Sequence, residues 1–540
     1  MPADPVTVLE AFRRTVTAFP ERPVLTYFYT VLTGRDVDRA SDALAATLAD
    51  NGFAASDRIA LYLQNMPQYV LALLAAWKLG GIAVPVNPML TPAEVAKLLG
   101  DATPTVLVAL DELHTPELAE VLAASSVRRV ITTSALNWLG TAYHPGLPPS
   151  RLPVPPGAED FTQLIATHQG RVPPPVLPAL DDTAVITYTS GTTGAPKGAM
   201  NTHRNIATGG YAYRDWFDLS AEDVVLGVAP LFHVTGLTGH IACALVSGAP
   251  LVLSYRFDTA VVLEMIYRHQ ATFTVGAITV FMALVDAAST RAHLATLTKI
   301  ASGGAPVAAA TVERFERRFG VYIHNVYGMT ETTSPVLAVP VGKRAPTGAQ
   351  TEALSVGVPM PGTRVAVLDD TGAPLCAGQI GEIAVAGPQV VPGYWRNPDE
   401  TAAAFRDGWL RTGDVGYADA EGWYYLVDRK KDMIVASGYK VWPREVEDVL
   451  YSHEAVLEAA VVGRPHPYRG ETVKAYVSLR QGHSVSPEQL VEHCRARLAA
   501  YKYPREVEIV DSMPKTASGK ILRRSFREPV SDVAPLDGHS

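Results

Sequence analysis

The stretch YTSGTTGAPKGAM, Tyr188 to Met200, follows the apolar run Ala184–Ile186 and is rich in glycine, serine and threonine. Glycine permits backbone angles that turn successive N–H groups toward one point, and such a nest binds anions. Hydroxyl groups and a lysine ammonium would add donors to the same anion. The stretch therefore predicts a phosphate-binding loop after a strand, against the alternative of a glycine-rich surface turn. The residues that would form it are Thr189, Ser190, Gly191, Thr192, Thr193, Gly194, Lys197 and Gly198.

This loop fits neither the Walker A pattern nor the glycine pattern of dinucleotide-binding folds. The pattern G-x-x-x-x-G-K-[S/T] cannot be laid on it, and no G-x-G-x-x-G follows a strand pattern anywhere in the chain. A nucleotide site here would therefore belong to another kind of fold.

The composition is that of a folded protein with two or more domains. The chain has 540 residues, 48% apolar and 19% charged, whereas a single core stops growing at roughly 250 to 300 residues. The net charge is −8 and no long block of like charges occurs, which excludes the basic face of a nucleic-acid-binding protein. The three cysteines lie far apart without metal-ligand spacing, so we expect small buried side chains in a reducing compartment.

Neither a secretory signal nor a membrane span is indicated. The N-terminus has acidic side chains and no apolar core segment. The most apolar segment, Tyr69–Val86, is interrupted by Lys78 and the pair Gly80–Gly81. A helix followed by a buried strand explains it better than a span, which needs about 20 apolar residues. We expect a cytoplasmic protein. Peripheral membrane contact is left open, although no amphipathic basic helix supports it.

Strand and helix patterns alternate along most of the chain. Residues 36–110 alternate helical patterns with short β-branched runs, as βα units of a parallel sheet do. The proline-rich stretches 147–156 and 172–178 predict a surface connection that separates two lobes. The alternation resumes over residues 182–325, and residues 356–427 are rich in glycine and short strands. After Lys431 comes a compact α+β pattern.

We therefore expect an α/β fold with a large N-terminal domain, residues 1–430, made of two βα-type lobes and a small β subdomain. A small, mobile α+β domain, residues 431–540, is expected to follow it.

Six further stretches accompany the glycine-rich loop in a fixed order. They are ASGGAPV (Ala301–Val307), YGMTETT (Tyr327–Thr333), TGD (Thr412–Asp414), DRKKDMI (Asp428–Ile434), SGYKVWPREVE (Ser437–Glu447) and PKTASGKILRR (Pro514–Arg524). From about residue 8 to residue 526 the chain resembles the adenylate-forming superfamily: acyl-CoA synthetases, firefly luciferases and the adenylation domains of peptide synthetases. The passage from Asp432 to Gly463 resembles bacterial medium- and long-chain fatty acyl-CoA ligases.

The resemblance implies a nucleotide site. Tyr327 offers a ring for adenine, Thr330 a hydroxyl for the α-phosphate, and Glu331 a hard oxygen ligand for Mg²⁺. Asp414 and Arg429 are the implied ribose and phosphate contacts. Further implied nucleotide contacts are Gly303, Gly304, Ala305, Asn325, Gly328 and Met329, and Thr192 is a second implied metal ligand.

The resemblance also implies a catalytic lysine and a hinge. Lys520 would stabilise the negative charge that forms when a carboxylate attacks the α-phosphate. The second half-reaction needs another arrangement of the site, and the family reaches it by rotating the C-terminal domain about a hinge residue, here Lys431. After that rotation Ser437, Gly438 and Lys440 would face the pantetheine tunnel. Lys440 departs from the asparagine, glutamine or arginine that is common in the family.

The segment PLFHVTGLTGH, Pro230–His240, would line the acyl pocket. Peptide synthetases have an aspartate after the phenylalanine here, whereas this chain has His233, which disfavours an amino acid substrate. His233 is expected to flank the substrate carboxylate, against the alternative of a packed core histidine. Gly236 and Gly239, with Ala242 and Ala244 beyond them, are expected to leave room for an apolar chain.

These observations predict a carboxylic acid:CoA ligase that uses ATP, Mg²⁺ and coenzyme A, acting on medium or long aliphatic acids. The alternatives are a fatty acyl-AMP ligase that loads an acyl carrier protein, an aryl-CoA ligase, and a nucleotide-binding relic without activity. Luciferase-like oxidation would need a luciferin, to which no residue points. A homodimer is left open.

Overall fold

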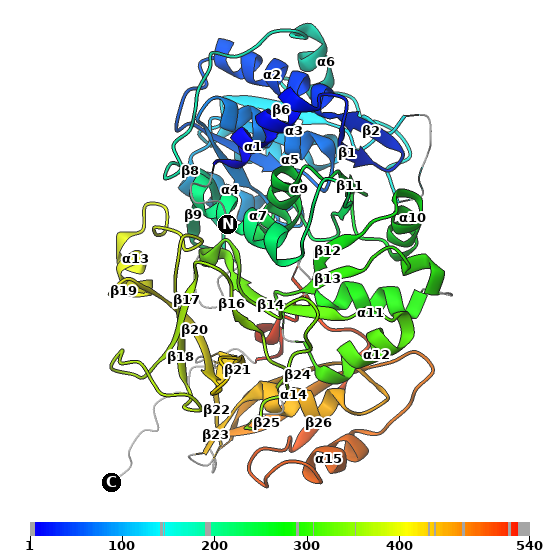
Figure 1. Ribbon diagram of the computed structural model, residues 1–540, viewed down its shortest axis with the longest axis vertical. Helices are drawn as coiled ribbons and strands as arrows, with labels where there is room; N and C mark the ends of the chain where they lie inside the picture. Colours follow the sequence, from blue (N-terminus) through cyan, green and yellow to red (C-terminus); the bar gives the residue numbers. More distant parts are fainter. Residues whose placement is uncertain are drawn as a thin grey trace, which may run out of the picture.

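The computed structural model describes residues 6–140, 144, 146–189, 196–287, 291–305, 307–350, 353–429, 432–436, 439–466, 470–516 and 520–527. We refer to the part up to residue 429 as the large domain and to the part from residue 432 as the small domain. Figure 1 shows the small domain below the large one, next to helices and strands of the middle of the chain.

The first sheet of the large domain has seven strands, parallel except for its last pair. In spatial order they are β7 (Glu159–Asp160), β6 (Arg129–Thr133), β5 (Val106–Leu110), β3 (Arg58–Tyr62), β4 (Ile82–Pro85), β8 (Thr183–Tyr188) and β9 (Gly198–Thr202). Four of the helices of this part of the chain are α3 (Pro67–Lys78), α4 (Pro92–Ala102), α5 (Pro116–Ala123) and α6 (Phe161–Thr167).

The second sheet has nine strands and draws on two distant parts of the chain. In spatial order they are β16 (Val358–Pro359), β15 (Ser334–Ala338), β14 (Ile323–Met329), β13 (Lys299–Ser302), β12 (Phe273–Gly276), β10 (Val225–Leu226), β11 (Leu251–Leu253), β1 (Pro23–Tyr27) and β2 (Thr30–Thr33). The other longer helices of the large domain are α1 (Val8–Ala18), α2 (Gly34–Asp50), α7 (His203–Trp216), α10 (Thr259–His269), α11 (Ile278–Ala287) and α12 (Ala309–Phe319). Short helical segments are η1 (Asp111–Leu113), α8 (Val234–Gly236), the π-helical η2 (Leu237–Ala242), α9 (Cys243–Ser247), η3 (Arg291–Leu294) and η4 (Thr330–Thr332).

The two lobes interleave in sequence, which corrects one prediction. Residues 147–156 and 172–178 do run over the surface, where Val172 and Leu177 are exposed. They do not separate the lobes, because β8 returns to pair with β4 in the same sheet as β3. The chain changes sheets twice, between β2 and β3 and between β9 and β10, and β1 joins the nine-stranded sheet by pairing with β11. Proline marks a break in regular structure, but it does not say which sheet the chain enters next.

Helix α3 shows how the apolar segment Tyr69–Val86 is used. Every residue of α3 is buried, as expected for a helix that is apolar on all sides and packed inside a domain. The ammonium of Lys78 lies 2.7 Å from carboxylate oxygens of both Asp38 and Asp42, so its charge is paired inside the protein. The segment then continues into β4. The predicted helix and buried strand are therefore confirmed, and no described helix is long and apolar enough to cross a bilayer.

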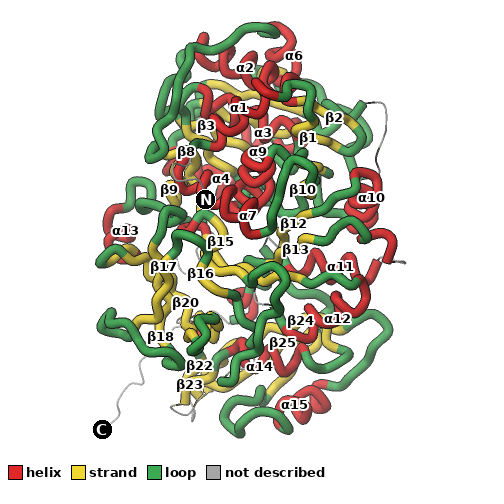
Figure 2. The backbone as a smooth tube through the Cα atoms, in the orientation of Figure 1, coloured by secondary structure: helices red, strands yellow, loops and turns green. Residues whose placement is uncertain are grey.

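The β subdomain and the small domain each have one five-stranded sheet, and Figure 2 shows how few helices the subdomain contains. The subdomain comprises β17 (Arg364–Leu368), β18 (Gly381–Ala386), α13 (Pro398–Ala404), β19 (Phe405–Arg406), β20 (Trp409–Ala418) and β21 (Tyr424–Arg429). The small domain comprises β22 (Ile434–Ala436), β23 (Tyr439–Val441), α14 (Pro443–Tyr451), β24 (Val456–His466), β25 (Gly470–Leu479), α15 (Pro487–Arg495), β26 (Glu506–Ile509) and η6 (Arg523–Phe526). The predicted fold class, α/β with a large domain and a small α+β domain, is confirmed.

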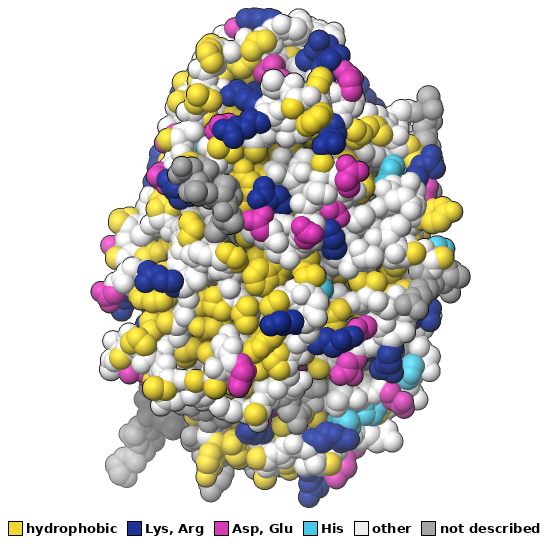
Figure 3. Space-filling model, viewed as in Figure 1, with side chains coloured by type: hydrophobic (Ala, Val, Ile, Leu, Met, Phe, Trp, Pro, Cys, Tyr) yellow, Lys and Arg dark blue, Asp and Glu magenta, His cyan; other side chains and the backbone are white. Residues whose placement is uncertain are grey.

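The surface carries no concentration of one charge on the face shown in Figure 3. Lysine and arginine side chains are interspersed there with aspartate and glutamate. This agrees with the modest net charge of −8.

Candidate active site

Strands β14, β20 and β21 bring three predicted nucleotide contacts together. The hydroxyl of Tyr327 in β14 donates to Oδ2 of Asp414 at 2.7 Å. Asp414 and Arg429 face each other in register across β20 and β21, and Nε of Arg429 lies 3.2 Å from Oδ1 of Asp414. Burial, and then the charge of Asp414, hold the pKa of Tyr327 well above its usual value. The tyrosine therefore keeps its proton and acts as a donor that orients the carboxylate.

The acidic residue predicted to bind metal is fixed by a tyrosine that the sequence did not single out. Glu331 in η4 is buried, and its Oε1 accepts a hydrogen bond of 2.7 Å from the hydroxyl of Tyr394. Within the described residues nothing bonds its second carboxylate oxygen, so one oxygen is available to a cation. Glu331 therefore fits a Mg²⁺ ligand, although no cluster of three metal-ligating side chains occurs among the residues described. An ion here would have to take its other ligands from substrate phosphates and water.

The backbone around Glu331 is held from β9. The amide of Asn201 donates to the carbonyl of Thr330 at 3.3 Å and to the hydroxyl of Thr333 at 2.9 Å. Gly328 has to be glycine, because a Cβ there would lie 2.0 Å from the carbonyl oxygen of Ser334. The turn that presents Thr330 and Glu331 is therefore rigid before any ligand binds.

The glycine-rich loop connects the paired strands β8 and β9. The N–H of Thr189 donates to the carbonyl of Lys197 at 2.9 Å, which closes the base of the loop. The ammonium of Lys197 pairs with Glu400 and lies 5.1 Å from the centre of the Tyr394 ring. It is thus adjacent to the residue that holds Glu331. Ser190, Gly191, Thr192, Thr193 and Gly194 lie outside the described residues.

The segment after β13 approaches neighbouring backbone closely. The N–H of Gly303 donates to the carbonyl of Gly276 at 3.2 Å, and a Cβ on Gly303 would lie 2.8 Å from Cγ2 of Val326. Gly304 has a φ of 78°, a conformation that favours glycine, and Ala305 follows it. The side chain of Asn325, predicted as a nucleotide contact, instead donates to the carbonyl of Ser355 at 3.2 Å. This bond joins β14 to the segment before β16, and the predicted nucleotide contact of Asn325 stays a prediction.

Lys520 reaches this site from the small domain. It lies on a hairpin that is closed by an antiparallel bridge between Lys515 and Ile521. The N–H of Thr516 donates to the carbonyl of Lys520 at 2.7 Å, and the N–H of Lys520 donates to the hydroxyl of Thr516 at 3.1 Å. Burial, and then the charges of Arg429 and Arg523, lower the pKa of its ammonium to about 8, although Asp414 and Asp432 act in the opposite direction. The ammonium is therefore close enough to interact electrostatically with both Asp414 and Arg429.

His233 lies within the electrostatic reach of the same lysine. Burial, and then the charge of Lys520, lower its pKa to about 4, so its ring is neutral near pH 7. Its Nδ1 accepts from the N–H of Thr235 at 3.3 Å, which leaves the ring proton on Nε2. His233 can therefore offer one N–H to a substrate oxygen.

The glycines of the predicted acyl pocket do not leave open space, and that prediction is wrong. A Cβ on Gly236 would lie 2.1 Å from the carbonyl oxygen of Pro230, and one on Gly239 would lie 2.5 Å from Cγ1 of Val275. Ala242 packs closely on α7, where a Cβ on Gly210 would lie 3.0 Å from the Cβ of Ala242. These small residues let η2 pack closely against its neighbours, so their size says nothing about the length of the acyl chain.

A salt-bridge network joins the two domains beside Lys520. One carboxylate oxygen of Asp428, at the end of β21, accepts from Nη1 of Arg523 at 2.9 Å. The other accepts from the backbone N–H of Arg444 at 2.8 Å. Nη2 of Arg523 donates to Glu447 at 2.6 Å, and Nη2 of Arg444 donates to the carbonyl of Val307 at 3.1 Å. No sequence pattern predicted this network, although Arg523 stands in the same motif as Lys520.

Three further predicted residues lie outside the part of the chain that the structure describes. They are Lys431, Ser437 and Gly438, and Lys440 is described only through its backbone pairing with Val435 in β22 and β23. The predictions for these positions stay predictions.

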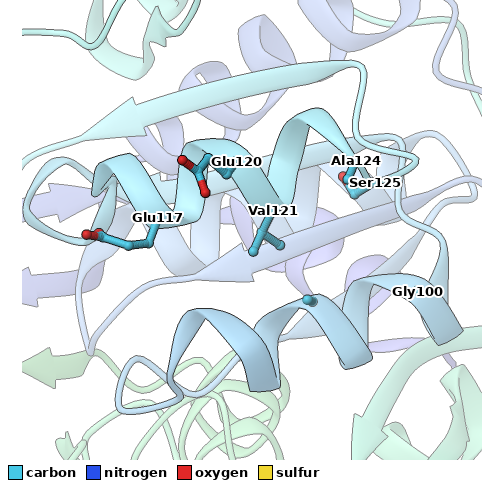
Figure 4. Close-up of a pocket in the computed structure, with 7 residues that line it drawn as sticks. Gly100, Glu117, Glu120, Val121, Ala124 and Ser125 are labelled. Atoms are coloured by element: carbon cyan, nitrogen blue, oxygen red, sulfur yellow. The ribbon is translucent and has the colours of Figure 1, made fainter.

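A surface pocket lies away from the site. It has a volume of about 350 Å³ and lies between α4 and α5. Figure 4 shows Val121 on α5 pointing toward α4, with Glu117 at one end of the pocket and Gly100, Ala124 and Ser125 at the other. None of its lining residues is a predicted site residue, so the pocket takes no part in the chemistry of the site.

Comparison with known proteins tests the family. Residues 12–395 match the model of the AMP-binding enzyme family, and residues 445–520 match the AMP-binding enzyme C-terminal domain. The chain belongs to the AMP-binding enzyme family. This member is 37% identical over 529 residues to the long-chain-fatty-acid–CoA ligase of Bacillus subtilis, which covers 94% of this chain and 92% of the relative.

Other relatives of this family member are named for feruloyl and anthranilate groups. It is 35% identical over 500 residues to the feruloyl-CoA synthase of an Amycolatopsis species, covering 92% of this chain and 94% of the relative. The solved structure of an anthranilate CoA ligase in complex with anthranoyl-AMP superposes with a TM-score of 0.87 at 26% identity, covering 97% of this chain and 96% of that one. All three relatives carry the names of CoA ligases or synthases, which confirms the prediction of an AMP-forming acyl-CoA synthetase.

Proposed function

We propose that this enzyme joins a medium- or long-chain fatty acid to CoA through an acyl-adenylate, with Lys520, Thr330 and His233 as catalytic residues. The observation that carries the proposal is the place of Lys520. The small domain presents its ammonium within electrostatic reach of Asp414, which Tyr327 and Arg429 orient in the large domain. A nucleotide whose ribose binds Asp414 would have its α-phosphate near that ammonium.

In the first half-reaction a carboxylate oxygen attacks the α-phosphorus of ATP. The bond from that phosphorus to the bridging oxygen breaks, and pyrophosphate leaves with the electron pair. Negative charge grows on the equatorial oxygens, where Lys520 and the hydroxyl of Thr330 would stabilise it. The N–H of His233 would hold the second oxygen of the acid.

In the second half-reaction the sulfur of CoA, as thiolate, attacks the acyl carbon. The bond between that carbon and the phosphate oxygen breaks, and AMP leaves. A thiol needs access where Lys520 now lies, so we place the domain boundary at residues 430 and 431 and the hinge at Lys431. Ser437, Gly438 and Lys440 would then turn toward the entering thiol.

Mg²⁺ would bind with ATP at Glu331, with Thr192 as a second ligand. Bound there, the ion would neutralise phosphate charge and help pyrophosphate to leave. The fit rests on the single carboxylate oxygen of Glu331 that its bond to Tyr394 leaves available.

An aliphatic acid is favoured over an aromatic one by the curated relatives, six of which carry the name long-chain-fatty-acid–CoA ligase. The feruloyl-CoA synthase and the anthranilate ligase support an aryl acid as the second candidate. An acyl carrier protein as acceptor, a homodimer and contact with a membrane surface have no supporting contact among the described residues.

The test is the release of AMP and pyrophosphate by the purified chain with ATP, Mg²⁺, CoA and acids from acetate to palmitate, with ferulate, benzoate and anthranilate in parallel. We expect the highest kcat/KM on an aliphatic acid, together with acyl-CoA. Highest kcat/KM on an aromatic acid would move the assignment to the aryl class. Pyrophosphate without thioester would indicate a carrier protein, and no turnover at all would contradict the proposed function.

A further inference from the structure

The loop that carries His233 is held by a side chain from the other lobe. This loop, residues 227–233, follows β10 at the carboxyl end of the nine-stranded sheet. Asn65 follows β3 of the seven-stranded sheet and is almost fully buried, with 6% of its surface exposed. It reaches across the junction between the two sheets.

Asn65 bonds the loop through both the donor and the acceptor group of its side chain. Its Nδ2 donates to the carbonyls of Gly227 and Ala229 at 3.1 and 2.9 Å. Its Oδ1 accepts from the N–H of Leu231 at 2.9 Å. Its backbone exchanges two further bonds of 3.0 Å with Tyr255, just after β11. An amide side chain has two donors and one acceptor group, and here both kinds face the loop.

The loop needs these partners because it leaves the sheet while still buried. Ala229 and Leu231 are buried, and buried backbone groups without partners are costly. A second side chain completes the set, since Nε2 of His240 accepts from the N–H of Ala229 at 3.0 Å. Side chains from two elements therefore take over the bonds that a neighbouring strand would make.

The same bonds fix the start of the segment that ends in His233. The N–H of His233 donates to the carbonyl of Pro230 at 3.1 Å, so Pro230, which lies between Ala229 and Leu231 that Asn65 bonds, is also the anchor of His233. On the other side Gly236 touches this carbonyl so closely that no Cβ would fit. A shift of residues 229–231 would therefore carry the imidazole with it.

We infer that Asn65 is a positioning residue for the reaction, which holds the His233 loop in the geometry that the carboxylate of the substrate requires. The inference rests on the proposed function for its catalytic part, because His233 is there the group that meets the acid. The hydrogen bonds themselves are independent of it. A misplacement of about 1 Å at a reacting centre can cost about 100-fold in rate, and Asn65 controls that distance without touching the substrate.

The chain supplies a matched control in Gln68. This residue lies three positions further along, is fully buried, and donates to the hydroxyl of Thr133 at 3.0 Å and the carbonyl of Ser134 at 3.1 Å. Its bonds stay within the seven-stranded lobe. Asn65→Ala and Gln68→Ala both remove a buried amide, and only the first releases the His233 loop.

The experiment is a double-mutant cycle on the full-length enzyme, measured well below the unfolding temperature of every variant. We expect Asn65→Ala to lower kcat/KM for the acid by about 10- to 100-fold while KM for ATP changes by less than about threefold. Gln68→Ala should lower Tm without this loss. In a His233→Ala background, Asn65→Ala should cost no more than about twofold, because both changes remove the same interaction. Full additivity of the two losses would overturn the inference.

Hydrogen exchange gives a readout that needs no activity. Peptides covering residues 227–236 should exchange at least about tenfold faster in Asn65→Ala than in the wild type and in Gln68→Ala. Unchanged protection of these peptides would overturn the inference even if the enzyme acts on another substrate. If the wild type is inactive but hydrogen exchange changes in Asn65→Ala as expected, the result would contradict the proposed function alone. Should Asn65→Ala fail to fold, Asn65→Ser, which keeps one donor and one acceptor, serves in both measurements.

Discussion

The two sides of the candidate site differ in how their residues are held. On the large-domain side, Asp414 is bonded to Tyr327 and Arg429, and Glu331 to Tyr394. On the small-domain side, Lys520 is ordered only by its own hairpin, and among the described residues no ion pair involves its ammonium. The nucleotide half is thus preorganised, whereas the catalytic charge depends on how the small domain is placed.

This difference has an electrostatic consequence. A preorganised dipole or carboxylate needs no rearrangement when charge develops on the substrate. A lysine with a lowered pKa is a cation held at some cost, and the phosphates of ATP would relieve that cost. We therefore expect Lys520 to contribute mainly to adenylation and Asp414 mainly to nucleotide binding.

The largest effect should come from the small-domain side. Lys520→Ala should lower pyrophosphate exchange by about 100- to 1,000-fold or more, as removal of one preorganised charge-stabilising group does. Thioester formation from preformed acyl-AMP should stay within about threefold of the wild type. Lys515→Ala, on the same hairpin and paired with Glu458, is the control and should keep normal exchange. Equal loss in both half-reactions would contradict the expectation that Lys520 contributes mainly to adenylation.

A smaller effect is expected on the preorganised side. Asp414→Asn should lower kcat/KM for ATP by about 10- to 100-fold, because hydrogen bonds to a charged group contribute about 1.5 to 3 kcal/mol each. Initial-rate kinetics with ATP as the varied substrate measures it. Asp419→Asn, at the turn after β20 and bonded to Tyr425 and Trp423, should leave KM for ATP unchanged. An unaltered kcat/KM in Asp414→Asn would remove Asp414 from the nucleotide site.

Loss of the contact between the two domains should lower activity less than the loss of Lys520 or Asp414. Asp428 accepts bonds from two residues of the small domain, Arg444 and Arg523. Asp428→Asn should therefore lower pyrophosphate exchange by about three- to tenfold and leave thioester formation from acyl-AMP at or above the wild-type rate. Measuring the half-reactions separately decides between this result and a uniform loss, which would point to general destabilisation.

The smallest effect is a dependence on pH. The pKa of Lys520 is lowered to about 8, first by burial and then by Arg429, and only its protonated form carries the charge. Adenylation kcat/KM should thus be about half-maximal at pH 8 and fall as pH rises further. His233, with a pKa of about 4, should add no change between pH 5 and 7. A profile of kcat/KM that stays flat to pH 9 would contradict this assignment.

The sequence was informative where chemistry lies close together along the chain. YGMTETT, at the end of β14 and in η4, and TGD, within β20, each marked candidate site residues, and the structure brings Tyr327 of the first into contact with Asp414 of the second. The order of strands could not be predicted, because it depends on pairings such as that of Leu25 with Leu251 that no local pattern encodes. Gly236 and Gly239 misled for a related reason, because a small residue looks the same whether a ligand or a neighbouring backbone fills its space.

Single side chains that act across elements were also missed. Tyr394 holds Glu331 from a loop before α13, and Asn65 holds the His233 loop from another lobe. Neither has a recurring spacing that marks it in the sequence. Such residues can be found only when the three-dimensional neighbours of a motif are known.

The position of β1 has a consequence for how the chain is made. Its register partner for Leu25 is Leu251, which is 226 positions later (251 minus 25). During synthesis, the first strand therefore stays without its parallel neighbour until nearly half of the chain has left the ribosome. Long-range parallel pairing is slow and leaves apolar strand edges exposed in the meantime. The nascent chain should accordingly depend on chaperone protection over this interval, and a fragment ending before β11 should be recovered as aggregate rather than as a folded lobe.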